Sequence, residues 1–176
     1  MKVKSKAWIH VVLWGLMVLY LFIAPPIKDK LTIKEGKPVD LGNVTLASSE
    51  SIRYNIDKIS EVKLGKQLLY RVIGWSFIKR DVKQTDYDVY LVLSSENHTY
   101  FFPTRRGNRE DVEKAFPDLA ADLSQSGFTA FIAKDTMKKD EYRVGFLFKH
   151  KTSGEMIYQS TDERLEKTFN RIKIVE

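Results

Sequence analysis

The chain has 176 residues, of which 43% are apolar and 30% charged, and its formal net charge is +6. That length holds one ordinary domain and a short appendage, because domains cluster near about 100 to 150 residues. The chain contains no cysteine, which excludes disulfide bonds and thiolate metal sites. Three of the positive charges are Lys2, Lys4 and Lys6, so the remaining residues carry a net charge of only +3, which argues against a nucleic-acid-binding protein.

An apolar stretch near the amino terminus, residues 7–27, contains no Asp, Glu, Lys or Arg. A helix needs about 20 apolar residues to cross a bilayer, so we expect a transmembrane helix here. Residues 1–6 form a basic tip, which the positive-inside rule places in the cytoplasm, with the rest of the chain outside. A cleaved signal peptide is the alternative. The length of the apolar run and its end, "FIAPPIK", which lacks the small residues of a cleavage site, favour an uncleaved signal anchor.

Two residues of the apolar stretch are candidates for contact with a protein partner in the membrane. Gly15 allows a second helix to approach closely, and Trp14 is a candidate interface anchor, with contact to membrane lipid as the alternative for both. Residues 28–37 begin after two prolines and are rich in charge, which is typical of a short stalk. Residues 38–176 then form the expected extracytoplasmic domain.

From residue 38 onward, short strand-like runs alternate with turn residues. About nine such runs at short spacing predict a mainly β fold, either a sandwich or a barrel, and more specifically an immunoglobulin-like antiparallel β-sandwich. One short helix is expected in the stretch "NREDVEKAFP", because Asn108 can cap its start and Pro117 ends it. The expected strands are residues 39–46, 58–64, 67–78, 87–95, 98–104, 127–133, 142–150, 155–160 and 171–176.

Period-two alternation predicts which side chains of each strand are buried. In the run from residue 87 to residue 95, Tyr87, Val89, Leu91 and Leu93 share one face, which we expect to face the core. In the run from residue 67 to residue 78, the bulky residues share one face and the small residues the other, and we expect Trp75 to pack between two sheets rather than to stack on a ligand. The residues predicted to form the structural core are Trp75, Phe77, Phe128 and Phe146.

Several segments together resemble a known kind of module. They are "GWSF" (74–77), "YLVLSS" (90–95), "YFFPT" (100–104), "NREDV" (108–112), "SGFTAFI" (126–132) and "YRVGF" (142–146). The set is similar to small extracytoplasmic β-sandwich modules that are appended to envelope glycosyltransferases or encoded with polysaccharide-assembly membrane proteins. The resemblance implies an accessory or interaction role outside the membrane and brings no catalytic residues with it.

The sequence offers little chemistry. The three histidines, His10, His98 and His150, are far apart and lack the spacing of a zinc site, and there is no nucleophile elbow or phosphate-binding glycine loop. We therefore expect no enzyme, no cofactor and no metal.

One basic cluster stands out in "PTRRGNRED", where Arg105, Arg106 and Arg109 precede the expected helix. Guanidinium groups and free helix N–H groups favour phosphate or carboxylate, so these residues are candidates for binding an anion or a glycan. Ion pairs with the acids that follow are the alternative.

Three classes of function remain. The first is a non-catalytic accessory subunit whose anchor and external domain engage a larger integral membrane protein, of envelope glycan assembly by the resemblance. The second is a membrane-anchored module that binds an anionic envelope polysaccharide or a lipid head group. The third is a hydrolase without a recognisable motif.

Overall fold

The structure is a computed structural model that describes residues 12–14, 17, 36–42, 44, 46, 49, 51–65, 67–119, 121–169 and 171–175. The chain divides into two compact units, Met1–Glu35 and Gly36–Glu176. In the first unit, Val12–Trp14 and Met17 are helical and exposed. The expected basic tip, Gly15, most of the expected membrane helix and all but the end of the stalk lie outside the described residues. Among the residues that are described, no helix has the length and apolarity needed to cross a bilayer.

The second unit consists mainly of antiparallel strands, which confirms the predicted β class. It also contains one short helix, α2 (Glu110–Ala115), and a 3-10 turn at Gln84–Asp86. The strands are β1 (Ile52–Leu64), β2 (Gln67–Ile78), β3 (Tyr87–Ser94), β4 (Thr99–Gly107), β5 (Gly127–Ala133), β6 (Asp140–His150), β7 (Met156–Lys167) and β8 (Ile172–Val175).

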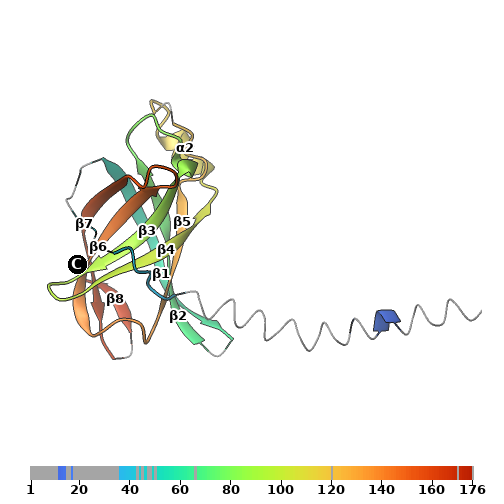
Figure 1. The fold of residues 1–176 in the computed structure, drawn as a ribbon, viewed down its shortest axis with the longest axis vertical. Helices are drawn as coiled ribbons and strands as arrows, with labels where there is room; N and C mark the ends of the chain where they lie inside the picture. The colour runs from blue at the N-terminus through green and yellow to red at the C-terminus, as the bar shows by residue number, and fades with distance from the viewer. Residues whose placement is uncertain are drawn as a thin grey trace, which may run out of the picture. The chain divides into compact units, whose positions relative to one another are not determined.

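The strands form one continuous sheet in the order β1-β2-β5-β4-β3-β6-β7-β8, rather than two separate sheets. Strand β4 joins the two halves because its first part, up to Pro103, pairs with β3, and its last part, from Thr104, pairs with β5. Proline has no N–H to donate, so Pro103 suits the point where one ladder ends and the next begins. The two halves curl towards each other around a shared interior, as Figure 1 shows.

The sheet nearly closes on itself where the chain enters β1. The backbone N–H of Ser49 donates to the carbonyl of Tyr158 in β7 at 2.8 Å, and the N–H of Ile52 donates to Oε1 of Gln159 at 2.7 Å. The start of the first strand therefore lies beside the seventh. This closure encloses a single main core without the help of a disulfide bond.

The main core follows the alternation predicted for β3. Tyr87, Val89, Leu91 and Leu93 all point into it, which confirms the inward face expected from the sequence. Phe128 and Phe146 also lie there, with their rings edge to face and 5.1 Å between centroids. Facing strands therefore supply interlocking aromatic side chains, as an interior at native packing density requires.

Around Trp75, strand β2 carries its bulky side chains on the outside of the sheet, whereas Tyr70, Val72 and Ile78 point into the main core. Its inner face carries Gly74 and Ser76, because the ring of Phe128 occupies the space over Gly74. Trp75 and Phe77 point outward and stack on each other at 5.7 Å, beneath the segment that contains α2. Trp75 thus packs in an outer cluster, with Phe77, Val112 and Leu123 at its centre, and not between two sheets as expected.

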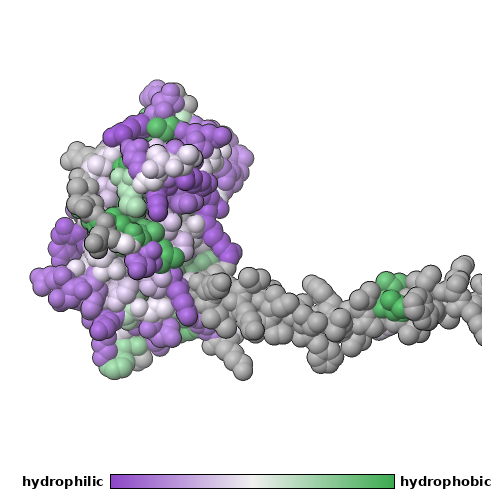
Figure 2. Space-filling model, in the orientation of Figure 1, coloured by the Kyte–Doolittle hydropathy of each residue, from purple (hydrophilic) through white to green (hydrophobic). Residues whose placement is uncertain are grey.

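The stretch from residue 39 to residue 46 was expected to be a strand, and its described residues do not form one. They make a single isolated bridge, between Val39 and Phe101. Leu41, Val44 and Leu46 instead pack on the outer face of the sheet, over a small cluster formed by Val92, Phe101, Leu147 and Tyr158. Elsewhere the surface is mostly hydrophilic, and on the face drawn in Figure 2 the apolar side chains gather in a patch across the middle.

The close packing of Phe128 on Gly74 gives a first prediction. A methyl group at residue 74 would meet the backbone oxygen of Asn55 and come within 2.9 Å of the Phe128 ring, whereas one at Gly107 in β4 meets nothing within 4 Å. Gly74→Ala should therefore lower the free energy of unfolding by about 1 to 3 kcal/mol. Gly107→Ala, the matched control, should change it by less than about 0.5 kcal/mol. Guanidinium unfolding of the two variants measures this, and equal midpoints would contradict it.

Candidate anion-binding site

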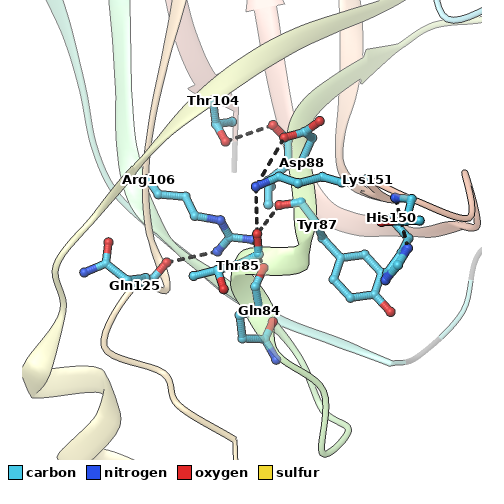
Figure 3. Close-up of polar contacts among 11 residues, drawn as sticks. Gln84, Thr85, Tyr87, Asp88, Thr104, Arg106, Gln125, His150 and Lys151 are labelled. Carbon is cyan, nitrogen blue, oxygen red and sulfur yellow. Dashed lines mark hydrogen bonds and ion pairs between the residues drawn. The ribbon is translucent and has the colours of Figure 1, made fainter.

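Arg106, one of the three predicted anion-binding residues, donates hydrogen bonds to backbone carbonyl groups. Its Nη1 donates to the carbonyl of Gln125 at 2.9 Å, and its Nη2 donates to the carbonyls of Tyr87, at 3.0 Å, and Gln84. Figure 3 shows the guanidinium group among these carbonyl oxygens. Burial lowers the pKa of Arg106. These N–H donors of Arg106 are used within the protein, so few donors remain for a ligand.

The reason for this arrangement is the bend in β4. Beyond Tyr90 the ladder between β3 and β4 stops, so carbonyl groups at the start of β3 lose their strand partner. The side chains of β4 replace it, because the hydroxyl of Thr104 donates to the carbonyl of Val89 at 2.9 Å and Arg106 reaches the carbonyl of Tyr87. Buried backbone groups require such partners. Arg106 is therefore part of the fold.

Arg109 joins the start of α2 to β1. Its Nη1 lies 2.6 Å from Asp57, and its Nε and Nη2 each donate to the carboxylate of Asp111 at 2.8 Å. The hydrogen bonds from Arg109 lower the pKa of Asp111 to about 2. This is the pairing with neighbouring acids that the sequence left open as the alternative to anion binding.

Arg105 lies on the opposite face of β4 from Arg106. It is exposed, and its guanidinium carbon lies 5.8 Å from the centre of the Phe131 ring, within cation–π range. The three arginines therefore do not converge on one point, although they are close in sequence. Each has its own contacts within the protein.

A different basic site lies at the other end of the sheet. A hollow of about 840 Å³ opens between the β5–β6 turn and the end of β7. Four lysines, one aspartate (Asp135) and an exposed aromatic residue line it, together with Leu68 and Met137. We call this hollow the lysine groove and define it by Lys134, Lys138, Lys139, Lys167 and Phe169.

Lys167 is the unusual member of the groove, because only 6% of its surface is exposed. Its ammonium group donates to the carbonyl of Thr168 at 2.8 Å. Burial lowers the pKa of Lys167, and the nearby charges of Lys134 and Lys139 lower it further, while Asp135 acts in the opposite direction. Within the described part of the chain, none of the four groove lysines forms an ion pair.

Phe169 forms the rim of the groove. It is 74% exposed, and Nζ of Lys139 lies 2.9 Å from the centre of its ring. The ammonium group thus sits on the negative face of the aromatic ring. The groove combines several cationic groups with one apolar edge, an arrangement that can hold an anionic group attached to an apolar body.

The groove is lined by groups that can bind an anion. Lysine ammonium groups are compact point charges that bind phosphate and carboxylate. Over the residues that the structure describes, no group of three His, Cys, Asp or Glu side chains could hold a metal ion.

The sequence contained only part of the signal for this groove. The run "KDTMKKDEY" places Lys134, Lys138 and Lys139 within one turn, and a basic cluster there could have been noticed. Lys167 joins them only because the β6–β7 hairpin pairs it with Asp140. The position of Lys167 beside the turn therefore depends on how two strands pair in the folded protein.

Comparison with known proteins gives no guide to the ligand. No family model, no curated protein and no solved structure matches this chain. The resemblance to modules of envelope glycan assembly therefore stays a prediction, and the groove has to be interpreted from its own residues.

The role of Arg106 at the bend gives a second prediction. Arg106→Met should lower the free energy of unfolding by about 2 to 4 kcal/mol, since each buried acceptor left without a donor costs about 1 to 3 kcal/mol. Arg105→Met, which removes the same charge from the other face of the same strand, should cost less than about 1 kcal/mol. Thermal and chemical unfolding of the two variants provide the comparison, and a larger loss in Arg105→Met would refute the assignment.

Proposed function

We propose that this chain is a membrane-anchored, non-catalytic accessory protein whose β-sheet unit, outside the membrane, binds an anionic group in the lysine groove. The observation that carries the proposal is the position of Lys167. A buried lysine lies among Lys134, Lys138 and Lys139 with no ion-pair partner in the described part of the chain.

The physical argument concerns the cost of that arrangement. A buried ammonium group loses hydration, and like charges beside it add to the cost. A phosphate or carboxylate in the groove would offset both, because it adds negative charge to a lining in which four lysines outnumber one aspartate, Asp135. The free energy of the groove is therefore highest when it is empty, and a bound anion lowers it.

The proposed anchor rests on the apolar stretch of residues 7–27. Val12, Leu13, Trp14 and Met17 are helical, and all four side chains are exposed. Apolar side chains of this kind would be covered by lipid or by a partner helix. The basic residues ahead of the stretch favour a cytoplasmic amino terminus. A membrane-impermeant thiol reagent, applied to intact cells with a single cysteine placed in the β-sheet unit, tests this orientation, and protection of that cysteine would refute it.

The immunoglobulin-like description of the fold also stays a proposal. In its favour, two antiparallel halves enclose one core, as the two sheets of a sandwich do. The continuous hydrogen bonding through β4 distinguishes this unit from a sandwich of two separate sheets.

The binding proposal is tested with inorganic phosphate as the probe. A ligand that binds only the native state raises the melting temperature. Phosphate should therefore raise the melting temperature of the full chain in neutral detergent above its value in chloride at equal ionic strength. Lys167→Met should abolish this rise and, because it removes a buried charge, should raise the melting temperature without phosphate.

The matched control is Lys114→Met, which removes an exposed lysine from α2. It should leave the response to phosphate unchanged. An equal response of Lys167→Met and wild type would show that the groove is not the anion site.

An accessory role with an integral membrane protein is the second part of the proposal, and the exposed apolar helix residues favour it. Full-length protein in mild detergent should co-purify with one membrane protein. A variant in which residues 7–24 are replaced by an unrelated membrane span should lose that protein. If nothing co-purifies with either form, the accessory role has no support.

A further inference from the structure

The location of the lysine groove in the fold bears on the identity of its ligand. We infer that the groove binds the phosphate-bearing head group of an anionic lipid in the same membrane that holds the apolar segment of residues 7–27. This inference rests on the proposed function, because it names the source of the anion. A soluble anionic polymer is the alternative that the experiment separates.

The chain enters the β-sheet unit beside the groove. The carbonyl of Gly36 accepts hydrogen bonds from the N–H of Ala133 at 2.8 Å and from the hydroxyl of Thr136 at 3.3 Å. These two residues flank Lys134 in the turn that forms one wall of the groove. The entry point of the chain and the basic turn are therefore fixed to each other.

The connection to the apolar segment is short. Nine residue steps separate Ile27 from Gly36. A fully extended chain advances at most about 3.3 to 3.6 Å per residue, so this connection reaches no more than about 32 Å. If residues 7–27 span the membrane, this length limits how far Gly36 can lie along the chain from the point where the segment leaves the lipid.

The groove turn and the segment that contains α2 differ in charge. The groove turn, residues 134–139, holds three lysines and one aspartate. At the opposite end, residues 110–122, which include α2, hold five acidic residues and one lysine. Figure 1 shows α2 and β8 at opposite ends of the sheet, and β8 begins beside Lys167. A negatively charged membrane surface would attract the basic groove turn.

The rim of the groove has the composition of a membrane-contacting surface. Phe side chains on a basic surface bury at the boundary between head groups and acyl chains, and Phe169 is the most exposed large apolar side chain among the described residues. The ammonium group of Lys139 lies over the ring of Phe169, so a cationic group and an apolar group are adjacent on the rim. A phospholipid offers the matching pair, a phosphate beside acyl chains, whereas a free anion offers only the charge.

The experiment uses the full chain in neutral detergent and native mass spectrometry, which resolves each bound lipid. Phosphatidylglycerol should bind more tightly than phosphatidylcholine. The double variant Lys139→Met with Lys167→Met should lose about thirtyfold in affinity for phosphatidylglycerol, which corresponds to about 1 kcal/mol for each basic residue. Its affinity for phosphatidylcholine should be unchanged.

The control double variant is Lys83→Met with Lys114→Met, which removes the same charge from exposed sites at the far end of the sheet. It should bind phosphatidylglycerol as wild type does, and an equal loss in this control would overturn the inference.

Two outcomes separate this inference from the proposed function. If inorganic phosphate still stabilises the protein through Lys167 while the two lipids bind equally, the groove binds a soluble anion and the lipid assignment is wrong. If neither phosphate nor phosphatidylglycerol depends on the groove lysines, both proposals fail.

Discussion

The bend in β4 is the constraint on which the β-sheet unit depends. This strand pairs with β3 along its first part and with β5 along its second, so the sheet continues from one half to the other through β4. The change of partner leaves carbonyl groups at the start of β3 without a strand beside them. Thr104 and Arg106 supply the missing donors, and in a chain without disulfide bonds these contacts and the core keep the halves together.

The same curling of the sheet creates the groove. Because the sheet nearly closes, the turn after β5 and the end of β7 meet at one end of the unit, and the pairing of Asp140 with Lys167 brings a buried ammonium group beside the basic turn. Electrostatic repulsion within that group works against folding. The lysines by themselves would not adopt this arrangement, and the packing of the strands stabilises it. An unfavourable electrostatic free energy of this kind is typical of binding sites.

The point where the chain enters the β-sheet unit relates the groove to the proposed anchor. The chain enters at Gly36, next to the groove, and the acidic residues around α2 lie at the far end. A cluster of lysines on a tethered domain favours the orientation that turns the cluster towards a negatively charged surface. In this interpretation the arginines near α2 hold the fold together, and the lysines near the entry point meet the ligand.

The sequence by itself determined the elements that depend on local pattern. Alternation in the run from Tyr87 to Leu93 showed which side chains share a face, and the turn residues placed most of the strands. Alternation does not say which face is covered by a second layer. Trp75 therefore has the expected neighbours along its strand but packs outside the sheet, because the Phe128 ring fills the inside over Gly74.

Tertiary structure alone decided the rest. Arg105, Arg106 and Arg109 are neighbours in sequence, yet strand alternation and the bend in β4 direct them to separate partners. Lys134 and Lys167 are 33 positions apart in the chain and share one groove. A charge cluster in sequence is a cluster in space only when the backbone keeps its side chains on one face, and the pairing of distant strands, which no local pattern encodes, sets that geometry.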